Sequence, residues 1–538
     1  MIRILLLALI LSLPAVSAEN DQNQTLLIEF KTRPQVNQLK KVRSLFKNAD
    51  LDRFDNYDND YFKRLYRFQF KGDKAQKKNI RSLLLKLPFI KKMEPIHQVE
   101  QLSIKVNPNA PRLKNDTFFS YQWGLYNSGQ KVFKDLDDIH SEVLEGRKGV
   151  DMGWKSIRKE LPNLMKKETI VAVLDSGLDL EHPDLKENIY KNEKECNSRG
   201  GLPFRPKKDN DGNGLIGDCM GWNFTSRKKG GDNRPYDDIG HGTHVAGIIA
   251  ASQGNKKGIS GVASKIKILP IKVLQKSEGG RNSRRNKGGS LTDRIAKGIL
   301  YAIKMKADVI NMSLGWPLIL DTTYLKESVK AALEQNIIIV AAAGNNNNKS
   351  PIFPCSYKGV LCVGSMSIDG SISNFSNYGG HVDVLAPGDN ILSTYPQKFD
   401  PDFFSVKGYE IKNGTSQSAP YISALAAILK STHPQIKSNE ITARILLGAR
   451  NEKENSSKYV SNGLAHIGKS VEAQKAPLIR PLFKDLKSLK VNPEDKKWSF
   501  NFSIKNYWKD GHKITLKVKS LRTPFILEKK IFEFDSIK

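Results

Sequence analysis

Four continuous apolar runs constrain the fold more than any other feature of this sequence. They are TIVAVLD (residues 169–175), KIKILPIKVL (265–274), ADVINMSL (307–314) and NIIIVAAAG (336–344). A run without polar alternation is typical of a parallel strand that is covered on both faces. Helical patterns lie between the runs, at residues 244–251, 291–305 and 324–335. This alternation predicts an α/β fold with a doubly wound, mostly parallel sheet, whose chemistry belongs at the carboxyl ends of the strands.

The chain of 538 residues is long enough for two or three folding units. Residues 1–18 combine Arg3 with a short apolar run and small residues before Ala18. This pattern predicts a secretory signal peptide cut after Ala18, and its apolar run is too short for a convincing membrane span. The α/β zone is expected over residues 116–474.

The flanks of that zone have different patterns. Residues 19–102 predict a small α+β unit, with strands at 25–31, 65–72 and 90–100 and a helix at 75–88. Residues 103–115 form a polar link with prolines. In residues 475–538, WSFNFSIK and KITLKVK alternate apolar and polar side chains, which predicts a small antiparallel β domain, a sandwich being one arrangement.

Charge and cysteine content bound the partners and the compartment. Lys and Arg exceed Asp and Glu by 86 to 56, a net charge of +30. This excess favours polyanions, yet no basic helix or aromatic-basic module stands out, so no specific nucleic-acid partner is expected and a solvated lysine-rich surface is the alternative. In an exported chain the four cysteines can oxidise, and three pairings are open. The sequence-local pairing, Cys196–Cys219 with Cys355–Cys362, is preferred over unpaired thiols.

Three segments of the α/β zone carry residues for nucleophilic catalysis. Asp175 ends an apolar run, His241 lies in DDIGHGTHVAG, and Ser416 lies in NGTSQSAP. A serine hydroxyl needs a base within hydrogen-bond reach, and the base needs a carboxylate that fixes its tautomer. Each segment alone is a weak signal, but all three in this order on strand ends and helix starts predict a catalytic triad.

These segments closely resemble the motifs of subtilisin-like serine proteases (subtilases), over about residues 116–474. YQWGLYNSGQ, VINMSLG and AAAGN extend the resemblance. It implies peptide-bond hydrolysis through an acyl-enzyme, with Asp175 orienting, His241 as general base and then acid, and Ser416 as nucleophile. Serine-carboxyl peptidases also use a Gly-Thr-Ser loop, but they lack the histidine of HGTHVAG. A catalytically inactive subtilase fold that binds polyanions or the cell envelope is the alternative from another class.

The resemblance also assigns an oxyanion hole and a substrate cleft. Asn345 matches the family's oxyanion asparagine, and the backbone N–H of Ser416 is the expected second donor. An extended substrate is expected to pair with an edge strand, and small residues are expected to floor the pocket before the cut. The residues of the edge strand are Ser313, Leu314 and Gly315. The residues of the pocket floor are Ala342, Ala343 and Gly344. Ile352 falls near the residue that lines this pocket in relatives.

The sequence departs from the family pattern after the nucleophile. Relatives usually have Met-Ala there, and this chain has Gln417 and Ser418. The change bears on rate and pocket polarity more than on mechanism. Pro420 is expected in the first turn of the following helix, where a missing N–H is tolerated.

The segment DNDGNGLIGD predicts a calcium site, with a metal-free turn as the alternative. Oxygen-bearing residues alternate around two glycines, as a hard cation requires, although no glutamate closes an EF-hand register. The expected ligands are Asp209, Asp211, Asn213, Asp218 and the carbonyl of Leu215. Many subtilases also carry structural calcium.

The resemblance further implies that the N-terminal unit is an inhibitory propeptide, removed by autocleavage between about Glu100 and Asn115. A stable accessory domain is the alternative. Residues 277–290 are expected to form a basic surface loop. We expect a monomer that acts on polypeptide substrates, either secreted or held in the periplasm or cell envelope.

Overall fold

The computed structural model divides the chain into two compact units, Met1–His97 and Gln98–Lys538. The structure describes residues 23–45, 49–54, 59–71, 80, 83–95, 98–101, 118–133, 143–196, 208–228, 230–276, 289–400, 406–450, 460, 462–473, 479–481, 489–492, 497–500, 504–506, 511–517 and 531–537. The predicted signal peptide, the 103–115 link and residues 277–288 of the basic loop lie outside this part of the chain. Within it, no helix is long and apolar enough to span a membrane.

The first unit is a four-stranded antiparallel sheet with a helix. Strand order is β2 (Ala49–Arg53), β3 (Leu65–Lys71), β1 (Asn23–Phe30), β4 (Ile90–Pro95), and the helix is α2 (Val36–Leu45). Alternate residues of β1 point to one face, so Leu26, Ile28 and Phe30 join the same core. The predicted strand over 90–100 is wrong as a single element. It splits into β4 and β5 (Gln98–Gln101), and β5 belongs to the second unit.

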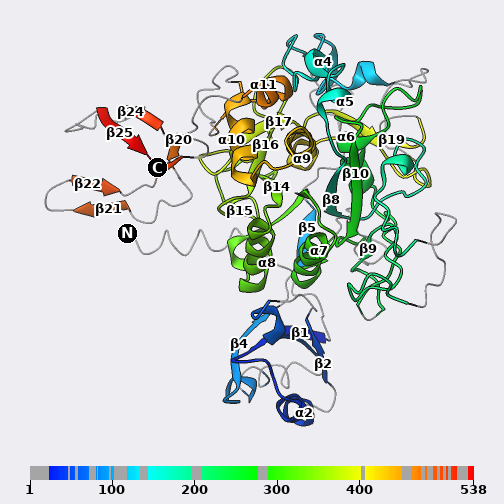
Figure 1. The fold of residues 1–538 in the computed structure, drawn as a ribbon, viewed down its shortest axis with the longest axis vertical. Helices are drawn as coiled ribbons and strands as arrows, with labels where there is room; N and C mark the ends of the chain where they lie inside the picture. Colours follow the sequence, from blue (N-terminus) through cyan, green and yellow to red (C-terminus); the bar gives the residue numbers. More distant parts are fainter. Residues whose placement is uncertain are drawn as a thin grey trace, which may run out of the picture. The chain divides into compact units, whose positions relative to one another are not determined.

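A seven-stranded parallel sheet forms the centre of the second unit (Figure 1). Its order is β17 (Val384–Pro387), β16 (Leu361–Met366), β14 (Ile338–Ala342), β12 (Val309–Met312), β8 (Thr169–Asp175), β10 (Ile266–Lys272), β9 (Trp222–Asn223). The predicted doubly wound α/β fold is confirmed, and all four apolar runs are strands of this sheet. Because β10 and β12 flank β8 on opposite sides, the connections change direction at β8, whose carboxyl end carries Asp175.

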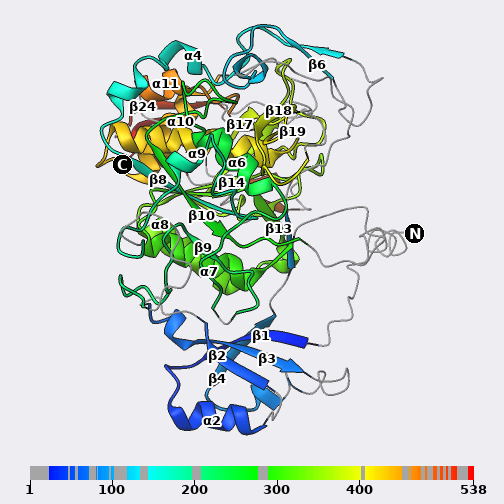
Figure 2. The ribbon, with the colours of Figure 1, turned by 90° about the vertical axis from the view of Figure 1, so that its right-hand side faces the viewer.

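Helices cover both faces of this sheet (Figure 2). The helices α6 (His241–Ala250), α9 (Thr415–Thr432) and α10 (Ser438–Gly448) pack together on one face, whereas α7 (Thr292–Lys304) and α8 (Thr323–Glu334) lie on the other. Every residue of α9 except Lys430 is buried, because the helix packs across β8, β12, β14 and β16. This helix brings the Ser416 segment to the strand ends.

A second sheet, antiparallel and four-stranded, lies in the same unit. Its order is β11 (Gly289–Leu291), β5, β13 (Leu314–Pro317), β15 (Ile352–Phe353). Glu100 and Gln101 of β5 lie opposite Gly315 and Leu314. The sequence placed residues 277–290 in a surface loop, and its last two residues instead begin β11, because β5 offers them a pairing partner.

Two disulfides and a set of hairpins complete the second unit. The pairs Cys196–Cys219 and Cys355–Cys362 confirm the predicted pairing. The hairpin of β18 (Ile391–Thr394) and β19 (Tyr409–Lys412) leads into α9. Near the C-terminus, β20 (Ile479–Pro481) pairs with β23 (Ile504–Asn506), β21 (Leu489–Asn492) with β22 (Lys497–Phe500), and β24 (Gly511–Lys517) with β25 (Ile531–Ile537), all antiparallel. A packed β domain here stays a prediction.

Candidate active site

The site begins at the carboxyl end of β8. Asp175 is fully buried there, and its Oδ1 accepts hydrogen bonds from His241 Nδ1 at 2.7 Å and from the backbone N–H of Ser176 at 2.7 Å. His241 is the first residue of α6 and is also buried. A carboxylate that accepts from Nδ1 fixes the tautomer in which Nε2 is the basic nitrogen.

The start of α6 is held by a second carboxylate. Oδ2 of Asp237 accepts from the backbone N–H and the hydroxyl of Thr243 at 2.9 and 2.7 Å, and its Oδ1 accepts from the backbone N–H of Gly240 at 2.8 Å. Gly240 has φ 91°, which any other residue would adopt only with strain. Asp237, three residues before the N-cap Gly240, therefore ties the loop before α6 to the first turn of the helix, which carries His241.

His244 lies behind His241 on the same helix without adding a charge. Its Nε2 faces the carbonyl oxygens of Ile391 and Glu410 at 3.0 and 3.1 Å. Burial lowers the pKa of His244 well below its usual value, and the positive charge of Lys412 lowers this pKa further. The ring is thus neutral at pH 7 and adds no positive charge next to His241.

Ser416 is the second residue of α9 and is fully buried. Its hydroxyl donates to the carbonyl of Ser313 at 3.0 Å, and the hydroxyl of Ser313 donates to the carbonyl of Ser416 at 2.8 Å. Nε2 of His241 makes no hydrogen bond with any described residue. The structure therefore joins Asp175 to His241, while the Ser416 hydroxyl lies on Ser313 rather than on the imidazole.

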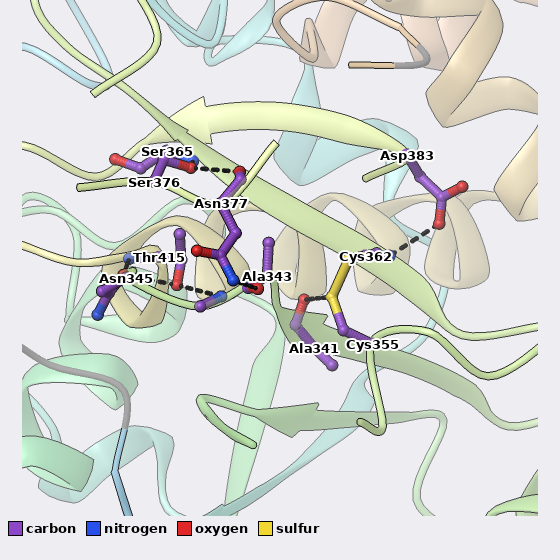
Figure 3. Close-up of a disulfide and its surroundings, with 11 residues drawn as sticks. Ala341, Ala343, Asn345, Cys355, Cys362, Ser365, Ser376, Asn377, Asp383 and Thr415 are labelled. Atoms are coloured by element: carbon purple, nitrogen blue, oxygen red, sulfur yellow. Dashed lines mark hydrogen bonds between the residues drawn. A yellow bond between two sulfur atoms is a disulfide. The ribbon is translucent and has the colours of Figure 1, made fainter. Parts of the chain in front are cut away.

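Asn345 follows β14 at the carboxyl edge of the same sheet. Its Oδ1 accepts from the backbone N–H and the hydroxyl of Thr415, both at 2.9 Å (Figure 3). The hydroxyl of Thr415 also accepts from the backbone N–H of Gly344 at 3.1 Å. These bonds orient the amide with Nδ2 as its donor end, one residue from Ser416.

The predicted pocket floor lies directly after β14. Ala342 ends the strand, and Ala343 and Gly344 follow it, all three buried. A Cβ atom on Gly344 would lie 3.1 Å from Cγ1 of Ile352 and 2.6 Å from Nδ2 of Asn377, so Gly344 admits no larger residue. The side chain of Ile352 thus lies beside Gly344, and its part in a specificity pocket stays a prediction.

A disulfide braces the wall that carries Ile352. Cys355 follows β15 and bonds to Cys362 of β16, next to the carbonyl of Ala341, with both cysteines buried (Figure 3). Asn377 ties the same region together, since its Nδ2 donates to the carbonyl of Ala343 at 3.0 Å. The sequence did not single out Asn377, because only the fold brings it to this strand.

Two polar side chains beside the nucleophile are unusual. The amide oxygen and nitrogen of Gln417 and the hydroxyl of Ser418 have no hydrogen-bond partner among the described residues, although both residues are fully buried. The expected place of Pro420 is wrong. Since α9 begins at Thr415, Pro420 is its sixth residue and lies inside the helix, past the first turn.

The acidic loop differs from the predicted ligand set. Carboxylate oxygens of Glu195, Asp211 and Asp218 lie within 4.8 Å of one another. Asp209 instead caps the loop, accepting from the backbone N–H groups of Gly212 and Gly214 at 2.8 and 2.7 Å.

Asn213 contacts the cluster through its amide nitrogen, and the carbonyl of Leu215 stays a predicted ligand. Nδ2 of Asn213 donates to Asp211 at 3.0 Å and to Asp218 at 2.8 Å, and its Oδ1 accepts from the N–H of Leu215 at 2.8 Å. Glu195 was missed by the sequence analysis. The Cys196–Cys219 pairing could have indicated it, because that bond brings the neighbours Glu195 and Asp218 together.

Charge of one sign is concentrated in this acidic cluster. Burial raises the pKa of Asp218 to about 6, and the nearby carboxylates of Asp211 and Glu195 raise it as well. The donors from Tyr301 at 2.7 Å and Asn192 at 3.1 Å are neutral. The three carboxylates offer the oxygen ligands that Ca²⁺ prefers, and this cation would offset their repulsion.

Comparison with known proteins identifies the family. A family model described as the subtilase family matches residues 166–463. The chain belongs to the subtilase family.

Its relatives include bacterial proteases of known type. The subtilase is 37% identical to the major intracellular serine protease of Bacillus subtilis over 266 residues, which is 48% of this chain and 68% of that protein. It is 32% identical to subtilisin E of the same species over 56% of this chain and 63% of that one. With a cell wall-associated protease of B. subtilis it shares 28% identity over 76% of this chain but only 37% of the relative.

A solved structure supports the fold. Fervidolysin from Fervidobacterium pennivorans, described as a keratinolytic enzyme related to subtilisin, matches with a TM-score of 0.58 at 21% identity over 85% of this chain and 62% of that one. The subtilase therefore has the subtilisin-like fold, and with its relatives it is a serine-type endopeptidase.

Proposed function

We propose that the subtilase hydrolyses peptide bonds through an acyl-enzyme on Ser416, with His241 as base and Asp175 as orienting carboxylate. The observation that carries this is the 2.7 Å bond between His241 Nδ1 and Asp175 Oδ1 at the amino end of α6. For reaction, the Ser416 hydroxyl must leave the Ser313 carbonyl and donate to Nε2. The imidazolium then protonates the leaving amine, and water repeats the sequence to release the acid.

Two donors would stabilise the tetrahedral intermediate. The Asn345 amide is one, since its oxygen accepts from Thr415 and Nδ2 is therefore the donor end of the amide. The backbone N–H of Ser416 in the first turn of α9 is the other, and the helix dipole adds to it. Both donors are fixed before substrate binds, so no reorganisation is needed as charge develops.

We propose that the N-terminal unit is an intramolecular inhibitor. The strand that follows it in the sequence, β5, pairs antiparallel with β11 and β13 of the second unit, and this pairing supports inhibition by strand addition. Gln101, the last residue of β5, lies opposite Leu314. Leu102 follows it in the sequence and lies outside the described residues, and we propose autocleavage directly after Leu102.

N-terminal sequencing tests this cleavage site. The processed protein should begin at Ser103, and the full-length Ser416→Ala variant should remain uncut. A Leu102→Asp variant should process more slowly than a Gln76→Asp control. A mature N-terminus at another residue, or processing of the Ser416→Ala variant in isolation, would contradict autocleavage after Leu102.

Ile352 sets the size of the substrate side chain that precedes the cut. Its contact with the Gly344 floor supports a shallow pocket that favours small and medium side chains. In a peptide library, Ile352→Gly should raise cleavage after phenylalanine about 10- to 100-fold relative to cleavage after alanine. This is the discrimination typical of apolar pockets. An unchanged preference would show that Ile352 does not determine the specificity.

We also propose export and a calcium ion. The leader-like residues 1–18 and the two disulfides support an oxidising compartment, either secreted or in the periplasm or envelope. The cluster of Glu195, Asp211 and Asp218 supports a structural Ca²⁺.

A fluorophosphonate probe tests the central proposal. Processed protein should form one adduct, on Ser416, and Ser416→Ala should form none. Folded, processed protein that takes no adduct would favour an inactive subtilase fold with a binding role.

A further inference from the structure

Helix α9 has a defect directly behind the nucleophile. Pro420 lies inside the helix and has no N–H, so it cannot donate to the carbonyl four residues earlier, and its ring also crowds that carbonyl. That carbonyl belongs to Ser416. In a fully buried helix start, a carbonyl without a donor is costly and free to tilt.

Ser313 supplies the missing donor. Its hydroxyl donates to the Ser416 carbonyl at 2.8 Å, and its own carbonyl accepts from the Ser416 hydroxyl at 3.0 Å. Ser313 lies between β12 and β13, so this reciprocal pair joins the nucleophile to the strand that binds substrate. Both serines are fully buried in the full-length chain.

The Ser313 hydroxyl is itself oriented by a chain of bonds. Nδ2 of Asn311 donates to Oγ of Ser313 at 3.0 Å, and Oδ1 of Asn311 accepts from the hydroxyl of Ser423 at 2.8 Å. Because Asn311 fills one lone pair of Ser313, the single proton of the Ser313 hydroxyl is directed to Ser416. The chain begins and ends on α9, so it spans the Pro420 gap from Ser423 to Ser416.

We propose that Ser313 is a positioning residue, whose hydroxyl replaces the helical hydrogen bond that Pro420 removes and thereby fixes the backbone of Ser416 at the start of α9. It does not touch the reacting atoms through this hydroxyl. The inference rests on the proposed role of Ser416. It goes beyond the predicted part of Ser313, which concerned only the pairing of its main chain with substrate.

Two substitutions and their combination test the inference. Ser313→Ala keeps the carbonyl and loses the hydroxyl, so kcat should fall about tenfold while KM stays within about twofold, as expected for one buried carbonyl left without a donor. Pro420→Ala restores an N–H that can donate to Ser416. In the Pro420→Ala background, Ser313→Ala should lower kcat by less than about threefold.

Ser328→Ala is the matched control. Ser328 is a fully buried serine of α8 whose hydroxyl also donates to a helix carbonyl, that of Tyr324, away from the site. It should change the melting temperature without changing kcat. An equal loss of kcat from Ser313→Ala in the wild-type and in the Pro420→Ala background would overturn the inference. A merely structural role of Ser313 predicts no rescue by Pro420→Ala.

A second variant keeps the test decisive if Ser313→Ala does not fold. Ser423→Ala removes the far end of the same chain and should lower kcat about twofold to threefold, again with rescue by Pro420→Ala. Unchanged kcat in Ser423→Ala would then count against the inference. If Ser416→Ala is inactive but Ser313→Ala and Ser423→Ala keep full activity, only the inference is refuted. If Ser416→Ala keeps activity, the proposed function is refuted.

Discussion

Two carboxylate clusters of the second unit differ in how their negative charge is compensated. In the catalytic cluster, the Asp175 carboxylate accepts from His241, a side chain that can itself take up a proton. In the acidic cluster, carboxylate oxygens of Glu195, Asp211 and Asp218 lie within 4.8 Å of one another, and the side-chain donors Tyr301 and Asn192 are neutral. Among the described residues, the first cluster thus contains its own proton acceptor, whereas the proposed cation would compensate the charge of the second. The comparison predicts activity losses from changes to the first and cation-dependent stability from changes to the second.

The largest effect is expected at Asp175. Asp175→Asn should lower kcat about 10⁴-fold, because an amide no longer fixes the tautomer of His241 or stabilises its imidazolium. The melting temperature should be kept or rise, since a buried carboxylate is removed. Steady-state kinetics and thermal unfolding of the same preparation measure both.

A carboxylate at the other end of the sheet serves as control. Asp308 accepts from Lys167 at 2.9 Å before β12 begins, so Asp308→Asn should lower stability and leave kcat unchanged. Comparable kcat losses in the two variants would show that Asp175 acts only on stability.

The next effect is expected at Asn345. Asn345→Ala should lower kcat about 100- to 1000-fold with little change in KM, the loss known for the corresponding side chain of subtilisin itself. Asn346→Ala is the neighbouring control, because Asn346 is exposed and only its backbone N–H is bonded here, to Asn377 at 2.9 Å. A loss confined to KM would mean that Asn345 binds substrate and does not stabilise the intermediate.

Cation removal should affect stability rather than chemistry. Chelation should lower the melting temperature by about 5 °C, the scale of about 2 kcal/mol of ligand binding in a domain of this size, and added Ca²⁺ should restore it. Asp218→Asn should make the melting temperature insensitive to Ca²⁺, and Asp369→Asn, in a local turn, should keep the response. An equal response to Ca²⁺ in both variants would place the ion elsewhere.

The smallest effect is expected at Gln417, which follows Ser416. Its buried amide has no hydrogen-bond partner among the described residues. Because a thioether is oxidised by peroxide and an amide is not, the wild type should lose activity severalfold more slowly than Gln417→Met in dilute peroxide. Peptide mapping of the 413–430 segment reads out the oxidation. Rapid inactivation of the wild type with oxidation mapped to this segment would contradict the prediction.

The sequence alone determined the sheet and the candidates for catalysis. Runs without polar alternation can be satisfied only as strands covered on both faces, so residues 169–175 and the other three runs were identifiable locally. The strands β16 and β17 were not predicted. Their segments LCVGSM and VLAP contain Gly, Ser and Pro, which weaken a local strand signal.

Only the tertiary structure decided the contacts that depend on distant partners. Glu195 joins Asp218 across a disulfide, β11 forms because β5 lies beside it, and Ser313 meets Ser416 across 103 residues. No local pattern encodes such pairs, since each side chain is common in its own segment. Hydrophobic periodicity is a property of one segment, whereas a hydrogen bond needs two groups, and the fold alone brings the second group into place.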